Sequence, residues 1–198
     1  MVRRGRQTIK NVPMKFAPEN VYHIYNQGNN KEQLFKEDVH YYYFLQLYQS
    51  YLVTFCETLC WCLMPNHFHF MISTDERCLA FKEQGGLLLD PITNGIRKLL
   101  SAYTHEFNIK NNRSGALFRP KTKAKNLTEE ADGFNDQFGK QDYYLNCFNY
   151  IHQNPVEAKL VIHAEDWKWS SYRFYKGLRE KSFCNEELAK NICGLRMI

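Results

Sequence analysis

Two histidines one residue apart are the first side chains in this sequence whose types and spacing could do chemistry. His67 and His69 stand in the stretch LMPNHFHFMIS, which otherwise reads as a buried strand. Side chains at i and i+2 of a strand emerge on the same face, so the two imidazoles should point together. Imidazole nitrogens at this spacing could share one divalent ion. The alternative is a solvated pair at the edge of a sheet, with both rings hydrogen-bonded to water.

The apolar residues of the same stretch should form the core side of the strand and leave the imidazole face open: Phe68, Phe70, Met71 and Ile72. Two imidazoles do not complete a metal site, so a third ligand must come from another element.

A helix with polar and aromatic residues at helical spacing could supply that ligand. In NYIHQNP, Tyr150 and Asn154 are four residues apart and therefore share one face of a helix, with Tyr143, Asn146 and Gln153 as neighbours. Pro155 should stop the helix, so we expect the Asn154 amide to lie at its end and to reach outward. Taken alone, Tyr150 reads as a packed aromatic in a chain with 13 tyrosines.

A basic stripe follows the segment FRPKTKAK. Its four cations alternate with other residues and would line one face of an extended strand: Arg119, Lys121, Lys123 and Lys125. Such a row suits a nucleic-acid backbone, although lysines on a solvated edge strand give the same pattern. Further cations could extend the surface: Arg97 and Lys98 of a second helix, and Arg3, Arg4 and Arg6 near the N-terminus.

The elements that must position these residues follow from hydrophobic periodicity and turn signals. Strands are expected at residues 20–30, 58–65 and 67–73, the last two being either a pair or one strand interrupted by Pro65 and Asn66. Helices are expected at 36–55 with Asp38 as N-cap, at 91–112, at 142–153 and near the C-terminus. Residues 80–91 and 128–142 read as connectors, and residues 114–127 as an extended basic segment. Strands in hairpin-like pairs predict an α+β fold, an antiparallel sheet covered by helices on one face.

Composition and length bound the class of protein. The 198 residues suffice for one domain, 44% of them are hydrophobic, and the net charge of +5 gives a modest preference for an anionic partner. Seven cysteines form an odd count without a C-x-x-C pair, so we expect reduced thiols and a cytoplasmic protein. No apolar run is long enough for a membrane span, and the basic N-terminus lacks the apolar region of a signal peptide.

Four stretches in this order resemble a known family. CLMPNHFHFMI, SGALFRPKTK, NYIHQNPVEAKLV and DWKWSSYRFYKG are similar to motifs of the single-tyrosine HUH transposases, and within them of the REP-associated tyrosine transposases. The similarity runs from Val21 to Gly177. It implies a two-layer α/β sandwich with a central antiparallel sheet, the ferredoxin-like HUH nuclease fold. The domain would span residues 19–178, between a basic arm (1–18) and a short C-terminal helical extension (179–198).

The resemblance also implies a site and a reaction. His67 and His69 match the family's metal ligands, Tyr150 matches its nucleophile, and Asn154 matches the polar residue that completes the site, with Gln153 in reserve. Tyr150 would attack a phosphate of single-stranded DNA next to a hairpin and form a 5′-phosphotyrosine, assisted by Mg²⁺ or Mn²⁺. The family allows either a homodimer or a monomer.

Two other functions compete with this expectation. One is a domesticated protein that holds a DNA hairpin without cutting it. The other is a metal-dependent hydrolase in which Tyr150 is structural and a water attacks the phosphate.

Overall fold

A four-stranded antiparallel sheet forms the centre of the computed structural model, which describes residues 16–84, 87–133 and 137–195. The strands lie in the order β2-β3-β1-β6, with β1 at Val21–Gln27, β2 at Glu57–Met64, β3 at His67–Ser73 and β6 at Lys123–Asn126. β2 and β3 form the expected hairpin around Pro65 and Asn66. β3 pairs with β2 on one side and β1 on the other. The histidines therefore stand on an inner strand, which excludes the solvated-edge alternative.

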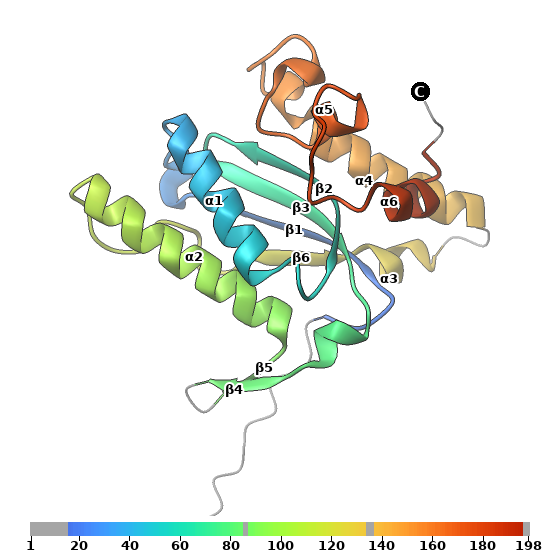
Figure 1. Cartoon of the computed structure of the whole chain (residues 1–198), viewed down its shortest axis with the longest axis horizontal. Helices are drawn as coiled ribbons and strands as arrows, with labels where there is room; N and C mark the ends of the chain where they lie inside the picture. Colours follow the sequence, from blue (N-terminus) through green and yellow to red (C-terminus); the bar gives the residue numbers. More distant parts are fainter. Residues whose placement is uncertain (1–15, 85–86, 134–136, 196–198) are drawn as a thin grey trace, which may run out of the picture.

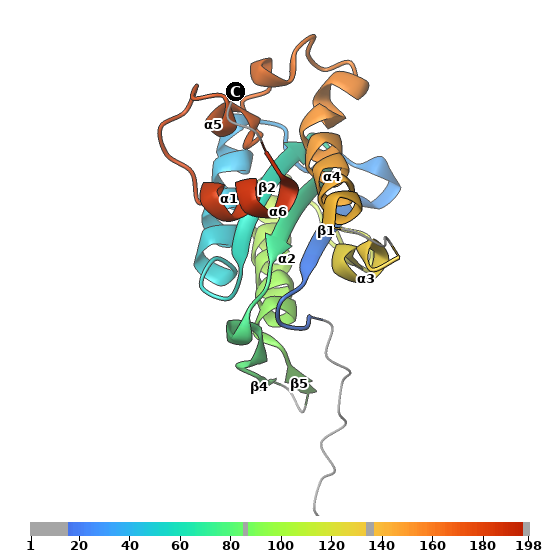
Figure 2. The ribbon, with the colours of Figure 1, turned by 90° about the vertical axis from the view of Figure 1, so that its right-hand side faces the viewer.

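Helices cover both faces of this sheet (Figures 1 and 2). One face carries α1 (Asp38–Tyr51) and α2 (Pro91–Lys110), and the other carries α3 (Leu127–Ala131), α4 (Gln137–Glu157) and α6 (Glu186–Cys193). The prediction of helices on one face, in two layers, is therefore wrong. The reason lies in the strands: every residue of β2 after Glu57 is buried, so both of its faces need a cover.

Side-chain alternation divides the core into an aromatic half and an aliphatic half. Phe68, Phe70 and Ile72 of β3 pack toward α1 and α2. Met71 lies on the same face of β3 as the histidines and packs toward α4. The prediction that it shares a face with Phe68 and Phe70 is therefore wrong. The imidazole face is thus partly covered by a helix, and the prediction that it is left open holds only near His67.

Short elements complete the chain, and two of them lie in a segment expected to be a loop. β4 (Lys82–Gln84) and β5 (Leu87–Leu89) pair antiparallel within residues 80–91. The remaining short helices are η1 (Asn29–Lys31), η2 (Glu76–Leu79), η3 (Ala164–Asp166) and α5 (Tyr172–Tyr175). In the part of the chain that the structure describes, no helix has the length and apolar character needed to cross a bilayer.

The helices depart from expectation at several places. α1 ends at Tyr51 and not at residue 55, and most of α3 and the start of α4 at Gln137 lie in the segment 128–142 that was predicted to be a connector. α1 is capped by Glu37 in a reciprocal capping box with His40, so Asp38 is its first residue and not its N-cap. α4 continues through Pro155 to Glu157, although proline has no amide hydrogen to donate. All seven cysteines are free thiols, as predicted. Of the basic N-terminal arm, residues 1–15 with Arg3, Arg4 and Arg6 lie outside the described residues.

We predict that Gly95→Ala destabilises the fold because α2 crosses closely over the end of α1. A Cβ at Gly95 would lie 2.4 Å from the backbone oxygen of Tyr51, which forces the two helices apart. Overpacking of this kind costs roughly 1–3 kcal/mol, more than the helix propensity gained from alanine. Urea unfolding measures the effect. Gly133→Ala is the control, since its nearest neighbour, the Glu130 oxygen, is 3.4 Å away, and equal midpoints for both variants would contradict the prediction.

Candidate functional site

The two histidines of β3 lie side by side beneath α4. Their ring centroids are 5.0 Å apart at right angles. His69 is buried, with 4% of its surface exposed, whereas His67 is partly buried near the end of the strand. Alternation along β3 therefore places both imidazoles on one face, as the sequence predicted, and α4 lies over that face.

A third histidine, His23 on β1, belongs to the same cluster and was missed by the sequence reasoning. Its Nε2 lies 2.8 Å from Nδ1 of His69, and both side chains are buried. The stretch VYHIYN could have shown that His23 and Tyr25 share a face. It could not show the register, in which Tyr25 stands opposite His69 and His23 opposite Met71.

The hydrogen bond to His23 leaves the other nitrogen of His69 unpaired. Among the described residues, His69 Nε2 is buried and has no hydrogen-bond partner. Burial lowers the pKa of all three imidazoles: that of His23 to about 4, that of His67 below its usual value, and that of His69 well below it. All three rings are therefore neutral near pH 7, and the Nε2 lone pair of His69 is available to a cation when Nδ1 carries the proton.

α4 brings Tyr150 and Asn154 to the histidines. The Tyr150 ring stands edge-on to that of His69 at a centroid distance of 5.7 Å, and 45% of its surface is exposed. This exposure excludes the interpretation of Tyr150 as a packed core aromatic. Its side chain can therefore be reached by a ligand from solution.

Asn154 lies on the same helix as Tyr150, as expected, but not at the end of that helix. It does not reach outward from a helix end: it lies inside α4, is buried, and donates from Nδ2 to the backbone oxygen of Tyr150 at 2.8 Å. The same side chain lies close enough to His67 to act on the pKa of that imidazole, raising it against the larger lowering by burial. Gln153, the reserve ligand, is exposed and lines neither cavity next to Tyr150.

The donor set fits a divalent metal ion. His67 and His69 are neighbouring neutral imidazoles, and the Asn154 amide lies next to His67. The buried Nε2 of His69 has no partner among the described residues, so these three side chains could act as ligands. Asn66 orients His67, since its Oδ1 lies 2.6 Å from Nδ1 of the imidazole. No group of three or more His, Cys, Asp or Glu residues within residues 16–84, 87–133 and 137–195 is arranged to hold a metal, so a third ligand here would have to be of another type, such as the amide of Asn154.

Two cavities meet at Tyr150. The first, here called the Tyr150 cavity, has a volume of about 270 Å³ and is lined by Tyr25, Asn26, Gln27, His67, His69, Arg119, Lys121, Lys123 and Tyr150. The second, of about 390 Å³, is lined by His23, Tyr25, His69, Lys125, Leu127, Tyr143, Asn146, Cys147 and Tyr150. Neither lining contains a carboxylate. An anion could therefore approach Tyr150 from either side.

The cations of the basic stripe differ in whether they form ion pairs. No carboxylate among the described residues forms an ion pair with Arg119, Lys121 or Lys123. Lys125, by contrast, is 2.8 Å from Glu130 and donates to Tyr143 Oη at 3.0 Å. The free positive charge is thus concentrated at the Tyr150 cavity.

Only part of the basic segment is a strand. Lys123 to Asn126 pair with β1, and the backbone amide of Arg119 donates to the Gln27 oxygen at 2.9 Å, but the residues between these two points lie outside the strand ladder. We call residues 119–122 the arch. Buried Asn26 fills the gap, donating from Nδ2 to the Arg119 backbone oxygen at 3.1 Å and to Thr122 Oγ1 at 3.0 Å. Arg97 and Lys98 lie on α2, on the other face of the sheet, and do not line the Tyr150 cavity.

The comparisons with known proteins give one structural similarity. No protein-family model matches the chain, and no curated protein matches it. A solved structure described as a REP-associated tyrosine transposase bound to a REP hairpin is similar over 88% of this chain and 89% of its own, with a TM-score of 0.57 and 14% sequence identity. At this identity the similarity shows the fold: a mixed α/β protein with a four-stranded antiparallel sheet and packed helices.

We predict that His152, which fixes α4 to the sheet, makes the protein sensitive to acid. It is fully buried, its Nε2 lies 2.8 Å from Ser171 Oγ, and burial lowers its pKa to about 3. Folding keeps this ring neutral at pH values where the unfolded chain would protonate it. The contribution of His152 to the free energy of unfolding is therefore complete above pH 6.5 and declines as the pH falls from 6.5 toward 3. For one such histidine the loss is roughly 2–3 kcal/mol between pH 7.5 and 4.5.

Urea unfolding of His152→Gln at the two pH values measures this contribution. The variant should lose about 2 kcal/mol less than the natural protein on acidification. His105→Gln, a change of an exposed histidine on α2, should retain the full pH dependence. If His152→Gln also retains the full pH dependence, then the buried imidazole is not the cause of the loss of stability in acid.

Proposed function

We propose that this protein is a metal-dependent tyrosine transposase that nicks and rejoins single-stranded DNA beside a hairpin. One observation carries the proposal: the exposed phenol of Tyr150 stands edge-on to the buried ring of His69, whose Nε2 has no partner within the described residues. The proposal includes the finer assignment of the sheet and helices to the ferredoxin-like HUH nuclease fold. The similar solved structure, a transposase bound to a hairpin, supports it.

The reaction follows from the chemistry of the residues. Tyr150 Oη would attack the phosphorus of a phosphodiester, forming a tyrosine–phosphate bond while the bond from phosphorus to the 3′ oxygen breaks. The phenol loses its proton and the departing 3′ oxygen gains one, so the products are a 5′-phosphotyrosine and a free 3′-hydroxyl. The ester energy is kept in the new bond. Attack by another 3′-hydroxyl would reverse the step and rejoin strands without ATP.

His67, His69 and Asn154 would hold one divalent ion. When bound, Mg²⁺ or Mn²⁺ would polarise the phosphate and neutralise the charge that develops on it. Two nitrogen ligands suit Mn²⁺ better than Mg²⁺. His23 would act as a positioning residue, because its hydrogen bond fixes the ring orientation and tautomer of His69.

The substrate class follows from the lining of the Tyr150 cavity. Arg119, Lys121 and Lys123 offer free cations to phosphates, while Tyr25 and Tyr150 offer ring faces to bases. Cations interleaved with aromatic rings are typical of single-strand binding sites. A flexible strand can also bend its backbone to the phenol more easily than a duplex can.

Tyr150→Phe tests the nucleophile. The natural protein, incubated with Mn²⁺ and a DNA hairpin bearing a single-stranded tail, should give a covalent protein–DNA adduct on a denaturing gel. The variant should give none, because the attacking oxygen is gone. Tyr144→Phe, on the same helix, is the matched control and should form the adduct normally.

The same gel separates the rival functions. Cleavage that survives in Tyr150→Phe would contradict the proposal and favour a hydrolase in which water attacks. Binding of the hairpin by the natural protein with no cleavage at any divalent ion would favour a hairpin-binding protein.

We expect substitutions in the histidine cluster to weaken Mn²⁺ binding to two different extents. His67→Ala and His69→Ala remove proposed ligands and should abolish both Mn²⁺ binding and adduct formation. His23→Ala removes only the hydrogen bond to His69 and should weaken Mn²⁺ binding about 10- to 100-fold. Calorimetric titration of Mn²⁺ measures both, without reliance on activity.

Hairpin binding in the absence of metal is the control for folding, and all three variants should retain it. Unchanged Mn²⁺ affinity in His69→Ala would show that the metal site is misassigned. An effect of His23→Ala as large as that of His69→Ala would make His23 a ligand and not a positioning residue.

A further inference from the structure

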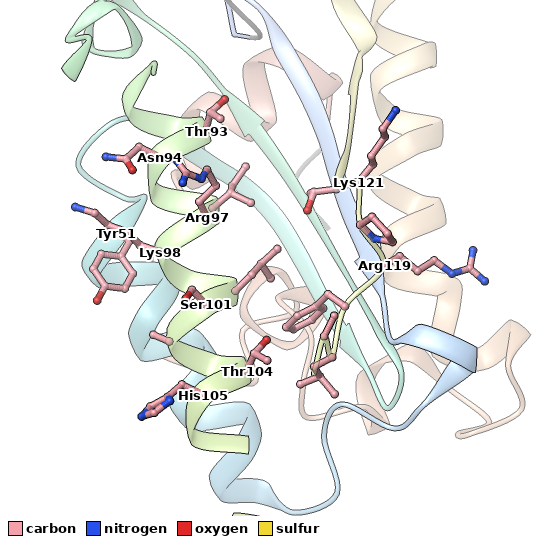
Figure 3. Close-up of a pocket in the computed structure, with 18 residues that line it drawn as sticks. Tyr51, Thr93, Asn94, Arg97, Lys98, Ser101, Thr104, His105, Arg119 and Lys121 are labelled. Atoms are coloured by element: carbon pink, nitrogen blue, oxygen red, sulfur yellow. The ribbon is translucent and has the colours of Figure 1, made fainter. Parts of the chain in front are cut away.

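A further, larger groove runs along α2, on the face of the sheet away from the histidines (Figure 3). Its volume is about 1310 Å³. One wall is α2 and the other is the segment 116–122, which includes the arch. We call it the α2 groove. The reaction proposed above does not use it.

The α2 wall carries hydrogen-bond donors at helical spacing. Thr93, Arg97, Ser101 and Thr104 follow one another at intervals of four, four and three residues, and therefore form one stripe. Thr93 Oγ1 is buried and has no partner among the described residues. Arg97 is exposed and forms no ion pair with any of them. Arginine with serine and threonine hydroxyls is the donor set that contacts DNA phosphates and sugars.

The electrostatics of the groove point to an anionic ligand. None of the residues that line it is Asp or Glu, and Arg97 and Lys98 of α2 are among them. Arg119 and Lys121 also line the groove, but their side chains extend to the side away from α2 (Figure 3). A concave surface with charge of one sign concentrates counter-charged ligands. The ligand class is therefore a polyanion long enough to follow the stripe.

The arch connects this groove to the Tyr150 cavity. Arg119 and Lys121 line both. Figure 3 shows their side chains extending from the arch to the side away from α2. A nucleic acid that lies along α2 would therefore reach the free cations of the arch and then Tyr150 by crossing the edge of the sheet.

The two cavities differ in what they offer to bases. Tyr25 and Tyr150 line the Tyr150 cavity, and Tyr150 is well exposed. Of the aromatic residues lining the α2 groove, Phe118 is buried in the core and Tyr51 lies on the far side of α2 from the arch (Figure 3). Single strands are bound by stacking their bases on aromatic rings, whereas a duplex hides its bases and presents its backbone.

We propose that the α2 groove binds the sugar-phosphate backbone of a double-stranded stem, while the adjoining single strand crosses the arch to Tyr150. The inference rests on the proposed function in that it takes a stem next to a single strand as the substrate. It assigns the two parts of that substrate to opposite faces of the sheet, with the arch between them.

Fluorescence anisotropy with three DNA probes tests the assignment: a blunt hairpin, the same hairpin with a single-stranded tail, and the tail alone. Arg97→Ala should weaken binding of the blunt hairpin about tenfold and lower its salt slope by about one, the change expected for one lost phosphate contact. Ser101→Glu, which places a negative charge in the groove, should weaken it further. Binding of the tail alone should not change.

Lys110→Ala is the matched control on the same helix. Lys110 is outside the groove and pairs with Glu106 at 3.1 Å, so its loss should leave all three affinities unchanged. Equal binding of the blunt hairpin by Arg97→Ala and the natural protein would overturn the inference. So would equal weakening of the hairpin and the tail, which would make the groove a single-strand site.

Adduct formation on the tail alone separates this inference from the proposed function. Arg97→Ala should form the adduct on the tail as the natural protein does. If the natural protein forms no adduct on the tail or on the tailed hairpin, but Arg97→Ala still loses the blunt hairpin, then the cleavage chemistry is refuted and the stem site stands.

Discussion

The hydrogen bond between His23 and His69 is the interaction on which the rest of the site depends. It joins β1 to β3 through two buried rings, and it leaves Nε2 of His69 as the one nitrogen of that ring without a partner among the described residues. A buried polar atom without a partner carries a desolvation cost of about 1–3 kcal/mol. The fold bears this cost at a point where a phenol and a second imidazole also converge. Such local conflict with the rules of folding is expected at functional sites.

The surroundings of the pair explain how the fold holds it. β3 is an inner strand with its apolar side chains packed against α1 and α2, so the opposite parity is left for the imidazoles and Met71. α4 covers that face, and its anchor to β2 runs from His152 through Ser171, whose hydroxyl also accepts from the Trp61 backbone amide at 2.9 Å. Tyr150 and Asn154 are therefore positioned by a helix whose own place is fixed in the core, and not by a loop.

Much of this arrangement could be predicted from local spacing. The common face of His67 and His69 follows from strand alternation, and that of Tyr150 and Asn154 from the helical repeat. What could not be predicted depends on pairing between distant segments. His23 joins the site only through the register of β1 on β3, and Lys125 loses its free charge only because α3 brings Glu130 to it. Helix propensity also misplaced the end of α4, because tertiary packing carries the helix through Pro155.

The sheet edge at β6 links the two faces of the molecule. A regular strand from residue 119 to 126 would have kept all four basic side chains in one row on one face. Asn26 instead substitutes its side chain for a ladder partner, and residues 120–122 lie outside the strand ladder while remaining attached at both ends. The backbone of the arch then forms one wall of the α2 groove, while Arg119 and Lys121 also line the Tyr150 cavity. With this irregularity the same two residues line cavities on both faces, whereas in a regular strand each side chain points to one face only.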